Sequence, residues 1–116
     1  MSKYLLLCTF SGREEDDQEL WTNQWTVGVF EQLGTCYVES ELDLKQVGTD
    51  SLEGRFNDDE QEEFEEELKN YLNQKVIRHR LENECKLFEP VLILSNDYWT
   101  DDHREIVNYV VIKVED

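Results

Sequence analysis

Residues 58–67 hold eight carboxylates in ten positions, and this acidic run constrains the fold more than any other part of the chain. Within and after it, apolar residues recur at spacings of three and four, the period of one face of an α-helix. These apolar residues are Phe64, Leu68, Tyr71, Leu72 and Val76. The spacing predicts a helix from Asn57 to about Arg80, with the apolar stripe facing a core and the carboxylates facing solvent.

The start of this helix has the residues that a helix N-terminus favours. Asn57 or Asp58 can cap it, and Glu60 stands three residues after Asn57, as a capping-box variant requires. Acidic side chains in the first turn also interact favourably with the helix dipole, but that effect fades after one turn. Later like-charge pairs such as Glu62 with Glu66 cost roughly 0.2–0.5 kcal/mol each. The charge is therefore either a solvated face without a role or a binding surface.

Net charge is the strongest functional signal. The chain has 28 acidic and 11 basic residues, a formal net charge of −17, and residues 41–70 hold twelve of the acids against three bases. Such a charge repels nucleic acid and anionic membranes and attracts basic proteins. Eight carboxylates over about 15 Å of helix give one charge per about 1.9 Å, close to the one per about 1.7 Å of duplex DNA. We therefore expect a basic nucleic-acid-binding protein as partner, and no direct binding to nucleic acid or membranes.

Two smaller acidic clusters have the same sign. The first contains Glu14, Glu15, Asp16 and Asp17. The second contains Asp97, Tyr98, Trp99, Asp101 and Asp102, in a stretch predicted to be a polar loop. Aromatic anchors within a polar rim are typical of binding hot spots, so Tyr98 and Trp99 are candidate contacts. The alternative is that Trp99 folds back over the edge of a sheet. The predicted partner-binding residues are these nine together with Asp58, Asp59, Glu60, Glu62, Glu63, Glu65, Glu66 and Glu67.

The rest of the chain predicts short strands and one further helix. The predicted strands are Lys3–Phe10, Thr35–Leu44, Glu89–Ser95 and Ile106–Val114. Leu20–Leu33 fits both helical and strand spacing, and we favour a helix because Asp16 and Asp17 suit its start and Gly34 its end. The predicted loops are Lys45–Phe56, which contains two glycines, and Asn96–Glu105. This order predicts one α+β domain over residues 1–116: a mostly antiparallel sheet of about four strands with two helices packed on one face.

Cysteine usage and hydropathy suggest a cytoplasmic protein. Cys8, Cys36 and Cys85 are odd in number and widely spaced, so we interpret them as buried thiols of the core. The sequence has no apolar run of about 18 residues, and its first ten residues lack the features of a secretory signal. We expect the protein in the cytoplasm, which would be the host cell cytoplasm if it is phage-encoded.

Motifs for catalysis are weak. The sequence has no phosphate-binding glycine loop, nucleophile elbow or calcium-loop pattern. Of its two histidines, His103 follows Asp101 and Asp102, a set that could bind a hard metal ion. We favour a solvated loop position for His103. We therefore predict no catalytic residues, no bound metal and no cofactor.

These observations lead to one main hypothesis and two alternatives. The main hypothesis is a non-enzymatic inhibitor that mimics nucleic acid and blocks the DNA- or RNA-binding cleft of a basic protein. Inhibitors of this design are typical of phage counter-defence, against restriction, CRISPR or host transcription. The alternatives are an immunity or antitoxin-type protein that neutralises a basic nuclease, and a small metal-dependent enzyme centred on Asp101, Asp102 and His103. The protein could act as a monomer or a homodimer.

Overall fold

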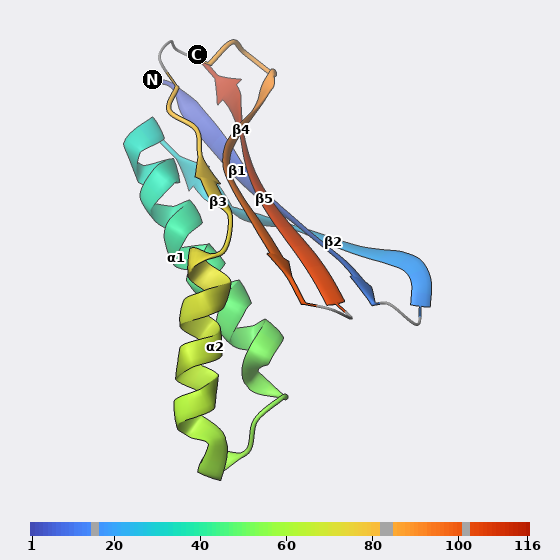
Figure 1. Cartoon of the computed structure of the whole chain (residues 1–116). Helices are drawn as coiled ribbons and strands as arrows, with labels where there is room; N and C mark the ends of the chain where they lie inside the picture. The colour runs from blue at the N-terminus through green and yellow to red at the C-terminus, as the bar shows by residue number, and fades with distance from the viewer. Residues whose placement is uncertain (15–16, 82–84, 101–102) are drawn as a thin grey trace.

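The computed structural model describes residues 1–14, 17–81, 85–100 and 103–116. Its strands are β1 (Lys3–Glu14), β2 (Asp17–Phe30), β3 (Val76–Arg78), β4 (Pro90–Trp99) and β5 (His103–Glu115). Its helices are α1 (Leu33–Glu53), the short 3₁₀ helix η1 (Asp58–Glu60) and α2 (Gln61–Asn73). The strands form one antiparallel sheet in the order β2-β1-β5-β4-β3 (Figure 1). The predicted α+β class is confirmed, although the sheet has five strands instead of about four.

One face of the sheet, which we call the inner face, packs against α1. On the two central strands it presents buried residues at every second position: Tyr4, Leu6 and Cys8 on β1, and Val107, Tyr109 and Val111 on β5. The chain returns from α1 through η1 into α2, which contacts α1 (Figure 1). The core lies between the inner face and the two helices. None of the helices in the described ranges is both long and apolar enough to cross a membrane.

The predicted helix at Leu20–Leu33 is wrong, because residues 20–30 belong to β2 and α1 begins only at Leu33. Trp25 and Phe30 both pack against the core, although five positions separate them and an uninterrupted strand would place them on opposite faces. A bulge at Val27 resolves this: Leu6 pairs with Gly28 and Leu7 with Thr26, which shifts the alternation by one residue. The bulge hides the period of two that a strand would otherwise show.

The predicted strand Thr35–Leu44 and the predicted loop Lys45–Phe56 are also wrong, because α1 runs through both. The buried residues of the helix form one stripe: Cys36, Ser40, Leu44, Val47, Gly48 and Leu52. Ser40 can be buried in this stripe because its hydroxyl has a hydrogen-bond partner, the Tyr37 carbonyl, to which it donates at 2.8 Å. By contrast Val38 and Leu42, which the strand interpretation placed with Cys36 and Leu44, are 57% and 58% exposed.

The predicted helix is present as η1 followed by α2, which begins at Gln61 and ends earlier than predicted. The capping box is confirmed: Asn57 Oδ1 accepts from the Asp59 amide at 3.1 Å, and Glu60 Oε2 accepts from the Asn57 amide at 3.3 Å. It caps η1, which leads into α2. The predicted end near Arg80 is wrong, because Lys75 adopts a left-handed φ of 47° and the next three residues pair with β4 as strand β3. The β-branched pair Val76 and Ile77 suits a strand better than a helix.

The three remaining predicted strands are confirmed, with longer bounds, and the predicted loop Asn96–Glu105 is wrong. Most of that loop lies in β4 and β5, joined by a tight hairpin in which the Thr100 amide donates to the His103 carbonyl at 2.7 Å. Its polar residues are compatible with strands because they have partners. Asn96 is buried and donates to the Tyr71 carbonyl at 3.2 Å.

The three cysteines are free and buried, as predicted. Burial raises the pKa of the Cys8 thiol to about 12 and that of Cys36 to about 11. A thiol reacts as the thiolate, so both are held in an unreactive form at neutral pH.

Replacing Gly48 should test the contact between the helices. A methyl group there would lie 2.8 Å from the Tyr71 ring, whereas one at Gly34, also in α1, meets open space. Crowding a packed core costs about 1–3 kcal/mol, and better helix propensity returns at most about 1 kcal/mol. Gly48→Ala should therefore lower the free energy of unfolding in urea by about 1 kcal/mol, and Gly34→Ala should leave it unchanged or raised. A Gly48→Ala variant as stable as the wild type would contradict this packing.

Candidate functional site

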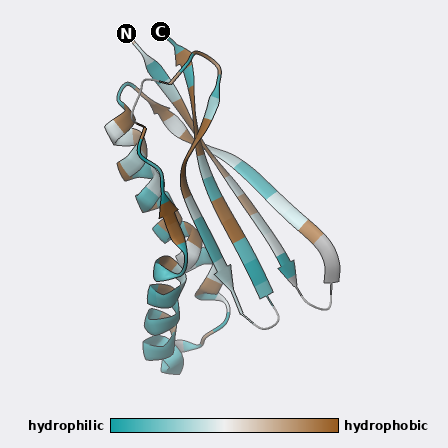
Figure 2. Cartoon of the chain, turned by 45° about the horizontal axis from the view of Figure 1, so that its top comes forward, coloured by the Kyte–Doolittle hydropathy of each residue, from teal (hydrophilic) through white to brown (hydrophobic). Residues whose placement is uncertain are grey.

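The acidic run forms one solvent-facing surface. Five carboxylates of η1 and α2 are exposed, and we call them the acidic face: Asp59, Glu62, Glu63, Glu65 and Glu66. The opposite side of α2 packs Phe64, Leu68 and Leu72 against the core. Figure 2 shows the result, with α2 drawn mainly in the hydrophilic colour. The side chain of Asp58 lies outside the described part of the structure.

Ion pairs in the described part of the chain leave the acidic face unneutralised. Of the charged side chains that the structure describes, those forming ion pairs lie elsewhere, and none of the five takes part. Besides Asp58, two other predicted acids of this segment remain, and both have internal partners. Glu60 belongs to the capping box, and half-buried Glu67 accepts a hydrogen bond from the Tyr98 hydroxyl at 3.2 Å.

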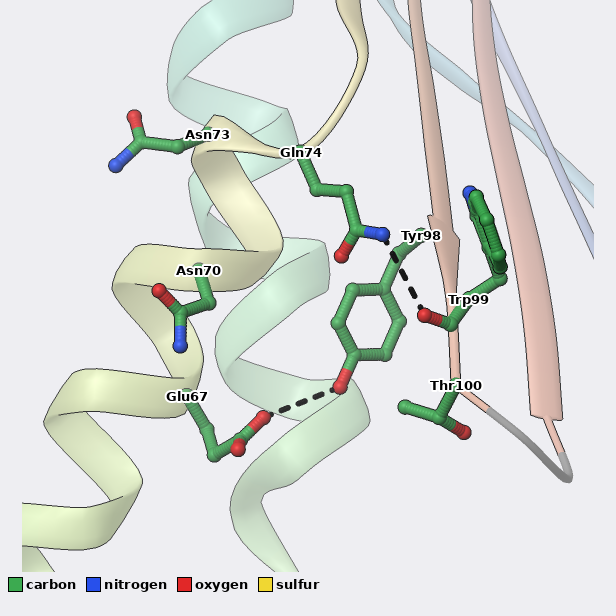
Figure 3. A pocket seen from close by; sticks show the side chains of 7 residues that line it. All are labelled: Glu67, Asn70, Asn73, Gln74, Tyr98, Trp99 and Thr100. Carbon is green, nitrogen blue, oxygen red and sulfur yellow. Dashed lines mark hydrogen bonds between the residues drawn. The ribbon is translucent and has the colours of Figure 1, made fainter.

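A cleft of about 440 Å³ lies beside the acidic face, between the second half of α2 and the end of β4 (Figure 3). Its lining residues are Glu67, Asn70, Asn73, Gln74, Tyr98, Trp99 and Thr100. The Gln74 side-chain amide donates to the Trp99 carbonyl at 3.5 Å and ties the end of α2 to the strand. The structure thus brings together three predicted site residues, Glu67, Tyr98 and Trp99. The three amide side chains were missed, because only the fold places them opposite β4.

Tyr98 and Trp99 have different environments because adjacent strand residues point to opposite faces. Tyr98 is 3% exposed, and its ring lies 4.7 Å from that of Tyr71. Burial, and after it the neighbouring Glu67 carboxylate, raises the pKa of the Tyr98 phenol. Trp99 is 47% exposed, with the Lys75 ammonium 4.6 Å from its ring centre. Trp99 is therefore the aromatic side chain of the pair that an incoming molecule can contact.

The chemistry of the cleft suits a basic side chain. A carboxylate has about four lone-pair sites, and the Tyr98 hydroxyl uses one of those on Glu67. The amide oxygens of Asn70, Asn73 and Gln74 can also accept hydrogen bonds. The exposed Trp99 ring already holds one ammonium group, which is the contact that cations favour with indoles.

The other predicted acids are placed less uniformly. Asp97 binds Arg104 through both carboxylate oxygens, at 3.2 and 3.0 Å, and this hydrogen bonding raises the pKa of the Arg104 guanidinium. Asp97 lies on the face of the sheet opposite to Tyr98. Glu14 pairs with Asp17 and with His103 in the sheet, so the two smaller clusters flank neighbouring strands at one end. Glu15, Asp16, Asp101 and Asp102 lie outside the described residues.

A buried carboxylate that the sequence analysis missed lies near this end. Glu105 is 3% exposed, accepts a hydrogen bond from the Ser51 hydroxyl at 2.6 Å and lies 2.6 Å from His103 Nε2. His103 is therefore not the solvated loop residue that we expected, because it begins β5 on the side that faces inward. The signal was present in β5, where Glu105 continues the alternation of Val107, Tyr109 and Val111.

This cluster differs from a catalytic triad. Ser51 and His103 contact the same oxygen of Glu105, whereas in a triad the histidine lies between the nucleophile and the acid. Within the described ranges, no three potential ligands are grouped to hold a metal ion. The hypothesis of a metal site at Asp101, Asp102 and His103 remains untested, since the two aspartates fall outside those ranges.

Comparison of the chain with protein-family models, curated proteins and solved structures gave no match.

Alkaline pH should destabilise the fold through its buried phenols. Burial is the main cause that raises the pKa of Tyr71, Tyr98 and Tyr109 in the folded protein. In the unfolded chain these phenols ionise near pH 10, so above about that pH the unfolded state releases protons that the folded state retains. The buried thiols of Cys8 and Cys36 act in the same direction, because in the unfolded chain they ionise near pH 8.5. The free energy of unfolding should therefore begin to fall above about pH 8 and fall more steeply above about pH 9.5.

Urea unfolding at about pH 8, 10 and 11 measures this dependence. The matched variant is Tyr98→Phe, which removes one of the three phenols and should show a shallower fall between the two higher pH values. Identical slopes for the variant and the wild type would show that Tyr98 is not protected from ionisation in this way.

Proposed function

We propose that the protein is a non-enzymatic inhibitor that imitates nucleic acid and occupies the nucleic-acid-binding cleft of a basic protein. The observation that supports this proposal is the acidic face: five exposed carboxylates on one helical surface, without ion pairs among the described residues. All eight acids of residues 58–67, counted together, have charges spaced about 2 Å apart along the helix axis. Duplex DNA spaces its phosphate charges about 1.7 Å apart.

Electrostatics favours this function over a passive solvated face. Like charges at neighbouring helical positions repel, and a basic partner that faces them removes that repulsion on binding. A concentrated anionic surface also steers a positively charged partner into encounter, at a rate that falls as salt is added. The surface is therefore suited to fast capture of a basic cleft.

The cleft beside the acidic face supplies the contact that would retain the partner. In the proposed complex, an arginine or lysine of the partner enters it and binds the Glu67 carboxylate and the amide oxygens of Asn70 and Asn73. The Trp99 ring, which points to the other side of β4 (Figure 3) and lies beside Lys75, offers the partner a second contact at the edge of the sheet. Desolvated aromatic contacts act mainly on the dissociation rate, so this contact and the cleft together would determine how long the complex lasts.

Charge reversal on the acidic face should abolish partner capture. The test variant replaces Glu62, Glu63 and Glu66 with Lys, and leaves Glu67 intact because it accepts the Tyr98 hydroxyl. The control replaces Glu31, Glu89 and Glu115 with Lys, which changes the net charge equally at exposed positions outside η1 and α2. We expect affinity for the captured partner to fall by about 100-fold or more, some 2.7 kcal/mol, in the test variant alone.

Immobilised wild type, test variant and control would each be exposed to bacterial lysate at about 50 mM salt, where screening is weak. Retained proteins would be identified by mass spectrometry and then challenged with duplex DNA. The proposal predicts a nucleic-acid-binding protein that the wild type and the control retain, the test variant loses, and DNA displaces. Equal retention by all three would refute it. Retention that depends on the acidic face but resists DNA would instead indicate the immunity-type alternative.

A further inference from the structure

The sheet has a second face, opposite to the helices, that is apolar at the end where β1 begins and β5 ends. On β1 the residues between the buried Tyr4, Leu6 and Cys8 point away from the core, and the register aligns them with outward residues of both neighbours. Leu5 is paired with Val29 and Ile112, and Leu7 with Val110, which is itself paired with Leu92. We call these six residues the outer patch: Leu5, Leu7, Val29, Leu92, Val110 and Ile112.

Nothing in the described part of the chain packs over the outer patch. Its six residues belong neither to the core cluster nor to the partly buried residues packed against it. At its borders Val29 is 54% exposed and Leu92 is 38% exposed. Both helices lie on the other side of the sheet (Figures 1 and 2). A contiguous apolar surface on a chain this polar is typical of an interaction site.

The distribution of charge indicates which molecule covers the outer patch. The outward positions of β1, β4 and β5, from Leu5 to Arg13, from Pro90 to Trp99 and from Arg104 to Ile112, contain one acidic residue, Asp97, and it is bound to Arg104. With Arg13, Arg104 and Asp97 these positions carry a net charge of +1, whereas the whole chain carries −17. Two copies therefore repel each other in most relative orientations, but they can approach with these faces of their sheets toward each other.

We propose that two copies of the chain associate through their outer patches, related by a two-fold axis, with the two sheets stacked against each other. Such an interface is isologous, so the same apolar side chains serve both partners. Stacked sheets pack about 10 Å apart with interdigitated side chains. Together with the polar outward positions that continue it, such as Thr9 and Ser11, the outer patch extends across four strands over about nine residues, roughly 19 by 30 Å. With the relief of the side chains, this area approaches the roughly 800 Å² per partner of a stable complex.

The dimer has four layers, with the sheets in the middle and the helices outside. Both acidic faces point outward, because each lies on the helix side of its own sheet (Figure 1). Dimerisation through the outer patch and partner binding through the acidic face therefore use separate surfaces, and dimerisation does not depend on the proposed inhibitor activity. The two kinds of association also respond to salt in opposite ways. Screening weakens the attraction to a basic partner, but it relieves the repulsion between two acidic copies.

The test is the mass of the purified protein in solution, measured by sedimentation and light scattering at about 50 and 500 mM salt, which spans weak to strong screening. The monomer has a mass of 13.9 kDa. We expect twice that mass, with a dimer dissociation constant that decreases at the higher salt. Leu7→Glu places a charge at the centre of the outer patch and should weaken association by at least tenfold, with circular dichroism unchanged.

Two further variants make the result decisive. Leu92→Glu lies at the border of the outer patch, where the wild-type side chain is already 38% exposed, so it should fold even if Leu7→Glu does not, and it should weaken the dimer. Leu42→Glu is the matched control, because it adds the same charge at a 58% exposed leucine of α1. A monomeric wild type at every concentration would overturn the proposal and assign the outer patch to a different protein. Equal weakening by Leu42→Glu, or none by Leu92→Glu, would overturn it too.

Discussion

Helix α1 packs its single buried stripe, from Cys36 to Leu52, into the inner face of the sheet, and this contact places everything else in the molecule. Gly48 in that stripe lets the Tyr71 ring approach the helix backbone, which positions α2. Tyr71 in turn lies against Tyr98 and accepts a hydrogen bond at its carbonyl from Asn96, so α2 is fixed against the end of β4. The acidic face is then left pointing outward, and the cleft forms beside it.

This arrangement separates the charge from the core. A chain with a net charge of −17 resists compaction, because its own acids repel one another. The structure relieves part of this by pairing some acids with bases, as Asp97 is with Arg104, and by using half-buried Asp43 as an acceptor for Trp25 Nε1 and the Tyr109 hydroxyl. The acidic face, which has no ion pair among the described residues, lies on η1 and α2, away from the outer patch. A basic partner and a second copy of the chain would therefore meet different sides of the molecule.

Residue patterns predicted the elements whose buried faces are mainly apolar. The strands at Lys3–Phe10 and Ile106–Val114 and the apolar stripe of α2 are of this kind. The prediction failed where a small or polar residue occupies a buried position, as Ser40 and Gly48 do in α1, or where a bulge changes the phase, as at Val27 in β2. Gly48 and the bulge depend on contacts with Tyr71 and with β1, which are far away in sequence and which no local pattern contains.

The same division holds for the candidate site. The exposed acids of α2 could be predicted because they alternate with an apolar stripe on a single helix. The cleft could not be predicted, because Asn70 and Gln74 line it only when the fold places them opposite β4. Trp99 was recognised from its acidic neighbours, but its strand position and its contact with Lys75 required the fold.

The most direct test of the central claim is to map the binding surface at residue resolution. Isotope-labelled protein would be titrated with the captured partner and followed by the backbone amide and indole signals in NMR spectra. The account predicts that the signals of residues 59–67 and the Trp99 indole change most, while those of the outer patch remain as they are. Changes confined to the outer patch or to α1, with α2 unaffected, would contradict it.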